Sequence, residues 1–255
     1  MNAPAARRSV RASLATPGAS WLLLALALAT GALLVTTIAG GSGGSGGSRA
    51  GPLANLLDWQ PDRSWPEVWR PWTSAWVHWS GAHLLVNLAG AVVVGGVGWR
   101  ARASHRTALA WFLAWPLTQA MLGLPFPAAT QELHPVGTLA HYGGLSGVLH
   151  AGVVVLGLAL AFPRSLASQA SRGDDLVPLT PAEARRHRLV GLALVAGTLM
   201  KVMLEAPWDL SLRPSALLGI AVAPLAHACG VAAGAAAWAI VAMAGRTADA
   251  RPQRG

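Results

Sequence analysis

Residues 143–162 read GGLSGVLHAGVVVLGLALAF, a serine among glycines followed by an apolar run without carboxylates, lysines or arginines. An α-helix needs about 20 such residues to cross the roughly 30 Å hydrocarbon core of a bilayer. Five further stretches have a similar length and composition: 19–39, 81–99, 107–124, 189–206 and 216–244. The sequence therefore predicts an all-α membrane protein, built as a bundle of six transmembrane helices.

Composition and charge placement support this class. Of the 255 residues, 53% are hydrophobic and 11% are charged, which is too apolar for an ordinary soluble domain. A formal net charge of +9 would otherwise suggest nucleic-acid binding. However, most basic residues fall in alternate connecting segments: Arg7, Arg8, Arg11, Arg100, Arg102, Arg106, Arg164, Arg172, Arg185, Arg186, Arg188, Arg246, Arg251 and Arg254. The positive-inside rule then places both termini in the cytoplasm, and no nucleic-acid partner is expected.

We expect one membrane domain with flanking segments. These are a cytoplasmic tail at 1–18, a first helix at 19–39, a Gly/Ser linker at 40–52, the main membrane domain at 53–244 and a cytoplasmic tail at 245–255. The first apolar run is long for a signal peptide, which favours a retained helix over a cleaved one. The tryptophan-rich stretch 51–80 is typical of the membrane interface. We expect a solvated cytoplasmic loop at 163–188 and a helix-packing role for the single cysteine, Cys229.

Ser146 and His227 are the candidate nucleophile and general base. Ser146 opens its apolar run, so it should lie in the first turn of a helix, where unpaired amides can stabilise an oxyanion. A serine hydroxyl needs a base within hydrogen-bond reach. Gly230 and Gly234 share a helix face near His227, and small residues at this spacing allow close helix approach, here expected against Gly143, Gly144 and Gly147. The competing interpretation is that each polar residue only links helices.

His83 and Asn87 are four residues apart, so they share a helix face and can both donate hydrogen bonds. We expect them to form an oxyanion hole with the amides of Leu145 and Ser146. His150 lies one turn after Ser146 and is the rival base. Lys201 and Glu205 form a pair that is either structural or substrate-reading. We expect no carboxylate to complete a catalytic triad, and no metal or organic cofactor.

Across roughly 66–240, the chain resembles the rhomboid family of intramembrane serine proteases. The matching residues are Glu67-Val68-Trp69-Arg70, Thr73, His78, His83, Asn87, Gly144-Leu145-Ser146-Gly147, and Ala226-His227 with Gly230 and Gly234. The resemblance implies a bacterial inner-membrane protein with a six-helix core. It also implies a Ser146–His227 dyad in a water-filled cavity open to the periplasm, and an oxyanion hole made by the Ser146 amide, His83 and Asn87.

One position departs from the family, because many rhomboids carry an aromatic residue where this chain has His150. Together with the compact size and the Lys201/Glu205 pair, His150 makes the chain similar to the rhombosortase branch. That likeness implies substrates with a C-terminal Gly-Gly motif, a single apolar helix and a basic end.

The expected function is hydrolysis of a peptide bond in or next to the transmembrane helix of a membrane-anchored protein. The expected partners are therefore this substrate and the lipid bilayer. A non-catalytic binder of transmembrane helices is the alternative, and such proteins usually lack the serine or the histidine. A transporter is disfavoured, because the ionisable residues cluster at the outer ends of the apolar stretches and form no relay across the bilayer.

Overall fold

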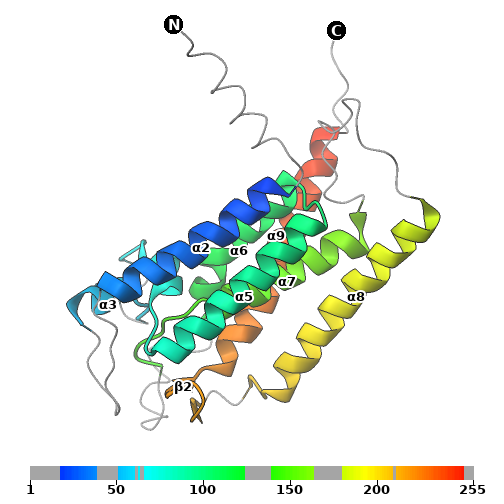
Figure 1. Ribbon diagram of the computed structural model, residues 1–255. Coiled ribbons are helices and arrows are strands. Elements are labelled where there is room, and N and C mark those ends of the chain that lie inside the picture. Colours follow the sequence, from blue (N-terminus) through cyan, green and yellow to red (C-terminus); the bar gives the residue numbers. More distant parts are fainter. Residues whose placement is uncertain are drawn as a thin grey trace, which may run out of the picture.

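The computed structural model describes residues 18–38, 51–60, 63, 66–123, 139–163, 180–208 and 211–249. They are mostly helical (Figure 1). The long helices are α2 (Ala19–Ile38), α5 (Gly81–Arg100), α6 (His105–Met121), α7 (Ser146–Ala161), α8 (Pro181–Leu204) and α9 (Pro224–Asp249). The short elements are α3 (Pro52–Leu57), α4 (Arg70–Thr73), the 3-10 helix η1 (Ser74–Trp76), and the strands β1 (Arg213–Ser215) and β2 (Ile220–Val222).

Four of these helices are long and apolar enough to cross a bilayer: α2, α5, α8 and the Pro224–Thr247 part of α9. With 16 residues, α7 is a shorter apolar helix, and α6 has 17 residues. The chain is thus an α-helical membrane protein, as predicted. The count of six membrane spans stays a prediction.

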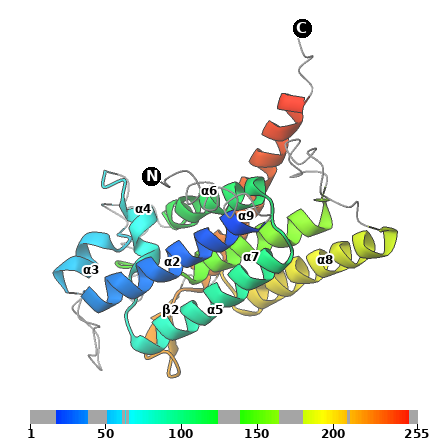
Figure 2. The ribbon, with the colours of Figure 1, turned by 45° about the horizontal axis from the view of Figure 1, so that its top comes forward.

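Helix α7 lies within the bundle and contacts α5, α6, α8 and α9. Helix α2 packs against α5 and α6, whereas α8 contacts α7 and α9 on the opposite side of the bundle (Figures 1 and 2). Glycines permit the α7–α9 contact, because a Cβ at Gly230 would collide with the Gly147 carbonyl oxygen and one at Gly234 would lie 2.7 Å from the Ala151 oxygen. The predicted approach to Gly147 is confirmed, but Gly143 lies against Val77 and Gly144 against His83.

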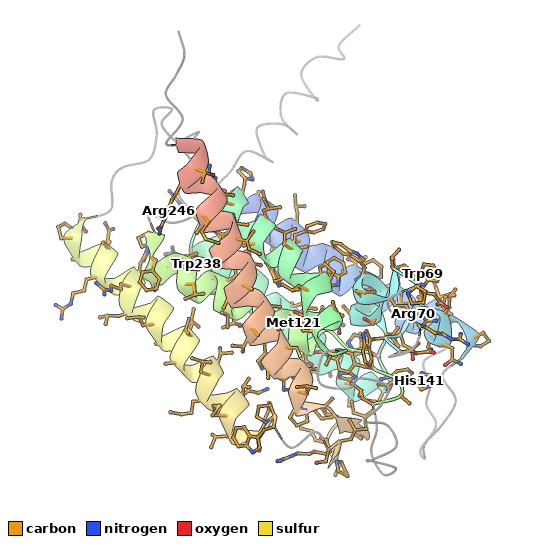
Figure 3. All side chains as sticks on the ribbon, turned by 180° about the vertical axis from the view of Figure 1, so that it is seen from behind. Trp69, Arg70, Met121, His141, Trp238 and Arg246 are labelled. Carbon is orange, nitrogen blue, oxygen red and sulfur yellow. The ribbon has the colours of Figure 1, made fainter. Side chains whose placement is uncertain are left out.

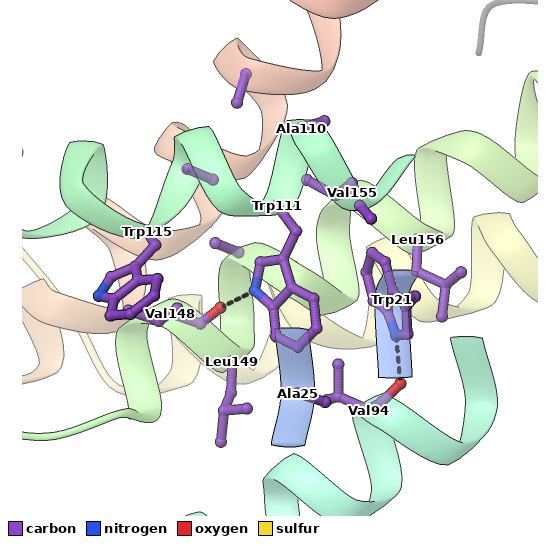
Figure 4. Packing of buried hydrophobic residues seen from close by; sticks show 14 of the residues in the cluster. Trp21, Ala25, Val94, Ala110, Trp111, Trp115, Val148, Leu149, Val155 and Leu156 are labelled. Atoms are coloured by element: carbon purple, nitrogen blue, oxygen red, sulfur yellow. Dashed lines mark hydrogen bonds between the residues drawn. The ribbon is translucent and has the colours of Figure 1, made fainter. Parts of the chain in front are cut away.

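Tryptophans fill much of the buried core (Figure 4). The rings of Trp21 and Trp111 have centroids 4.4 Å apart. Trp21 Nε1 donates to the Val94 carbonyl at 2.9 Å, and Trp111 Nε1 donates to the Val148 carbonyl at 2.8 Å. The indole N–H groups of Trp21 and Trp111 are therefore both paired, and the two bonds connect α2 to α5 and α6 to α7.

Two predicted boundaries are wrong. Residues 181–188 belong to α8, which starts with a capping box between Thr180 and Glu183 and with Pro181 in its first turn. Residues 216–222 belong to a β-hairpin, so the last helix starts at Pro224. Apolar composition alone did not distinguish the hairpin, whose Gly219 has a φ of +63°, from a helix.

Most of the predicted tails, linker and cytoplasmic loop lie outside the described residues. This applies to 1–17, 39–50, 164–179 and 250–255.

Candidate active site

The first turns of α7 and α9 bring Ser146 and His227 together. Ser146 is the first residue of α7, and the predicted base His227 is buried near the start of α9. His227 Nε2 lies 3.1 Å from Ser146 Oγ. This distance is within the range for a hydrogen bond from the hydroxyl to a neutral imidazole. The close contact between Gly147 and Gly230 makes this approach possible, because each glycine is adjacent to one of the polar residues.

A carboxylate contacts the other nitrogen of His227, which contradicts the expectation that none is placed to complete a triad. Glu205 Oε2 lies 2.7 Å from His227 Nδ1. Helix α8 ends at Leu204, and Glu205 is its C-cap residue, at the level where α7 and α9 begin. Burial raises the pKa of Glu205, but hydrogen bonds from His227 and Lys201 outweigh this effect and lower it to about 2. The carboxyl is therefore ionised at neutral pH.

Lys201 contacts several groups of the site. Its Nζ lies 2.9 Å from Glu205 Oε1, 2.8 Å from His150 Nε2 and 3.0 Å from His227 Nδ1. The predicted Lys201–Glu205 pair therefore exists, and both of its members touch a histidine. In the sequence, the signal for these contacts was an ionisable i, i+4 pair inside an otherwise apolar stretch.

His150, the rival base, does not contact the serine hydroxyl. Its Nδ1 lies 2.7 Å from the main-chain oxygen of Ser146, and its Nε2 faces Lys201. Its ring stacks on that of His227, with centroids 4.3 Å apart and an angle of 21° between the planes. His150 thus occupies a packing position against His227, with both nitrogens engaged away from Ser146 Oγ.

His83 and Asn87 lie on α5, facing the serine across a cavity. The His83 ring covers Gly144, where a Cβ would lie 2.8 Å from it, and its buried Nδ1 has no hydrogen-bond partner among the described residues. Asn87 Nδ2 lies 3.1 Å from His78 Nε2. An amide has two N–H donors, so this bond leaves one free. Both residues can therefore still donate to an oxyanion.

His78 fixes the orientation of Asn87, a role that the sequence did not reveal. His78 Nδ1 lies 3.1 Å from the Trp76 carbonyl oxygen. Burial lowers the pKa of His78 to about 4. The neutral ring then donates from Nδ1 to Trp76 and accepts at Nε2 from Asn87.

The chain leading into Ser146 is held by contacts to the segment before α5. Tyr142 and Trp59 form an antiparallel backbone bridge, and the Gly144 amide donates to the Ser74 carbonyl at 3.0 Å. Asp58 receives hydrogen bonds from Arg70 at 3.0 Å and from His141 at 2.6 Å. Arg70 and His141 lie at the same end of the bundle (Figure 3). These bonds fix the backbone that presents Ser146 and its neighbouring amides.

A cavity of about 770 Å³ connects these groups. Its lining includes Ser146, His227, His83, Asn87, His150, Lys201 and Glu205, together with apolar residues of α5, α7 and the β-hairpin. All predicted site residues except Leu145 therefore face one space. Leu145 is fully buried and immediately precedes α7.

Among the residues that the structure describes, no cluster of three or more His, Cys, Asp or Glu side chains is arranged to hold a metal ion. No model of a known protein family and no curated protein matches this sequence. A family assignment therefore rests on the motifs of the chain and on the geometry of its site.

Proposed function

We propose that this protein is a rhomboid-type intramembrane serine endopeptidase with Ser146 as nucleophile and His227 as general base. The observation that carries the proposal is the 3.1 Å contact between Ser146 Oγ and His227 Nε2 at the start of two apolar helices. Two further donors, His83 and Asn87, face the same cavity. A nucleophile, a base and oxyanion donors in one space are the set that acyl transfer requires.

The chemistry proceeds in two steps. His227 Nε2 accepts the Ser146 proton while Oγ attacks the scissile carbonyl, and the resulting imidazolium then protonates the leaving amine. Water, activated by the same histidine, hydrolyses the acyl-enzyme. The oxyanion of each tetrahedral intermediate is stabilised by the Ser146 amide, a His83 N–H and the free N–H of Asn87.

The proposed substrate is a membrane-anchored protein with a single transmembrane helix. A cavity lined mostly by apolar residues within a membrane bundle suits an apolar segment, and the reacting groups face the same space. The resemblance to rhombosortases, through His150 and the Lys201/Glu205 pair, favours removal of a C-terminal anchor of the Gly-Gly type. We place the protein in a bacterial inner membrane as a six-span rhomboid-like bundle, with the site open to the periplasm.

A serine-reactive fluorophosphonate tests the proposal without knowledge of the substrate. The purified protein in lipid should be labelled at Ser146, and Ser146→Ala and His227→Ala should abolish the labelling. Ser215→Ala is the matched control, because Ser215 lines the same cavity but lies on β1, whereas the serine hydroxyl that contacts His227 Nε2 is that of Ser146. Failure of the intact protein to react would contradict a protease and favour a non-catalytic binder of transmembrane helices.

A further inference from the structure

We propose that Glu205 and Lys201 form a positioning pair for His227, so that the nucleophile works as a Ser146–His227–Glu205 triad with Lys201 as its counter-charge. This inference rests on the proposed function and deepens it. A dyad would leave the orientation of the histidine to packing alone, whereas here a carboxylate oxygen lies 2.7 Å from its Nδ1.

The hydrogen bonds of the site are all satisfied by a single placement of the protons on the histidines. Ser146 Oγ can donate to His227 Nε2 only if the imidazole proton is on Nδ1, from which it is donated to Glu205 Oε2. The other oxygen, Oε1, accepts from Lys201. The carboxylate therefore selects the tautomer of His227 that can act as a base.

The remaining bonds return to the serine. Lys201 Nζ donates to His150 Nε2, which places the proton of His150 on Nδ1, and this nitrogen donates to the Ser146 carbonyl. The bonds thus form a closed ring that starts and ends on Ser146. Because His227 Nδ1 carries a proton, its 3.0 Å contact with Lys201 is between two donors and has only an electrostatic effect.

The contact between Lys201 Nζ and His227 Nδ1 explains why the Lys201/Glu205 pair matters for proton transfer. When His227 accepts the serine proton, a second positive charge forms beside the ammonium of Lys201. The Glu205 carboxylate contacts both cations and offsets their repulsion. Among the residues that the structure describes, His83 on α5 and His150 on α7 also interact electrostatically with His227. Without Glu205, the described residues that contact the imidazolium would be the Lys201 ammonium and the neutral groups of Ser146 and His150.

A purely structural role explains this pair poorly. Lysine preceding glutamate is the less favourable order for helix support, because it places the cation nearer the helix N-terminus. The Lys201 side chain is also 45% exposed and lines the cavity.

The test is the pH dependence of kcat/KM for the intact protein in lipid, with a quenched transmembrane substrate that carries a Gly-Gly motif and a basic end. Glu205→Gln should lower kcat at least 100-fold with little change in KM, and Glu205→Asp should recover part of the loss. The acidic limb of the profile should move to lower pH in Glu205→Gln, because the imidazolium loses its anion. It should move to higher pH in Lys201→Met, with less than about tenfold loss of rate.

The double variant Lys201→Met/Glu205→Gln should be faster than Glu205→Gln alone, because the remaining cation is removed. Arg185→Met is the matched control, since it removes an exposed charge from the opposite end of α8 and should leave the profile unchanged. If Glu205→Gln does not fold, the shift of the acidic limb in Lys201→Met still decides the question.

An unchanged profile in Lys201→Met, or a Glu205→Gln variant with the kcat of the original protein, would overturn the inference while leaving the protease intact. Movement of the acidic limb in the same direction in Lys201→Met and Glu205→Gln would overturn the inference as well. If the original protein neither cleaves substrate nor reacts with fluorophosphonate, the proposed function itself falls, and the triad with it.

Discussion

Two histidines of the site, His227 and His78, each use one ring nitrogen for a supporting contact and the other for a contact with a proposed catalytic group. His227 contacts Glu205 through Nδ1 and Ser146 through Nε2, and His78 contacts the Trp76 carbonyl through Nδ1 and Asn87 through Nε2. The first contact of each ring fixes its tautomer, and the tautomer decides what the second nitrogen can do. The reactivity of the site therefore depends on these supporting contacts as much as on the serine itself.

Replacing His78 should impair catalysis through Asn87. In His78→Phe, the Asn87 amide loses its acceptor and can rotate, so we expect kcat to fall about tenfold, less than the 100-fold or greater loss typical of removing an oxyanion donor outright. KM should hardly change. His78→Gln supplies an amide oxygen as a substitute acceptor and is the matched variant. Equal rates for both variants and the original protein would show that His78 does not position Asn87.

His78 also makes the folding stability of the protein depend on pH, so that stability falls as the solution becomes more acidic. Because burial lowers the pKa of His78 to about 4, its contribution is fully present above the pKa of an unfolded histidine, about 6.5, and is lost as the pH falls towards 4. Thermal unfolding measured over this range should show a smaller acid-induced drop in Tm for His78→Gln than for the original protein.

The sequence predicted which residues meet at the site, but not all of their contacts. Ser146, His83 and Asn87 were predictable because they lie in the first turns of an apolar stretch, and His227 because it precedes the small-residue spacing of Gly230 and Gly234. Glu205 was not, because its contact with His227 depends on where α8 ends and on how α8 lies against α7. His78 appeared only as part of a resemblance, since nothing in its spacing indicates a bond to Asn87.

Among the helices, the decisive contact is between α7 and α9. The missing side chains at Gly147 and Gly230 let the two backbones touch beside the serine and its base. Gly230→Ala should force these helices apart, because its Cβ would collide with the Gly147 carbonyl oxygen. We expect about 1–3 kcal/mol of destabilisation, the usual cost of overpacking.

Activity should fall further than stability in Gly230→Ala, at least 100-fold, because a shift of about 1 Å between nucleophile and base is sufficient for such a loss. Gly96→Ala on α5 is the control, since its Cβ would meet no atom within 4 Å. Fluorophosphonate labelling and thermal unfolding measure the two effects. Full labelling of Gly230→Ala would contradict the role assigned to this contact.

Helix positions were largely predictable from apolar stretches, whereas their ends were not. The capping box at Thr180 and the hairpin at 213–222 are local signals that an average over apolar residues hides. The hairpin is also tied to a distant residue, because Ser80 Oγ donates to the Leu218 carbonyl at 2.5 Å. Such long-range contacts are set by the assembled bundle.

For the whole molecule, charge placement predicts the orientation in the membrane. With both termini in the cytoplasm, Arg185 at the start of α8 should face the cytoplasm and Arg213 on β1 should face the periplasm. In a Cys229→Ser background, an impermeant maleimide added to intact cells should label Arg213→Cys and spare Arg185→Cys. The protein that keeps only Cys229, which is buried, is the control. The reverse labelling pattern would invert the proposed topology.

Cleavage of a transmembrane test substrate, with a Gly-Gly motif and a basic end, by the purified protein in lipid tests directly whether Ser146 and His227 form a protease. We expect cleavage by the original protein, loss of cleavage in Ser146→Ala and in His227→Ala, and retention of activity in His150→Ala. Cleavage that persists in Ser146→Ala would contradict the assignment of Ser146 as the nucleophile. Cleavage that is lost in His150→Ala while His227→Ala remains active would contradict the assignment of His227 as the base.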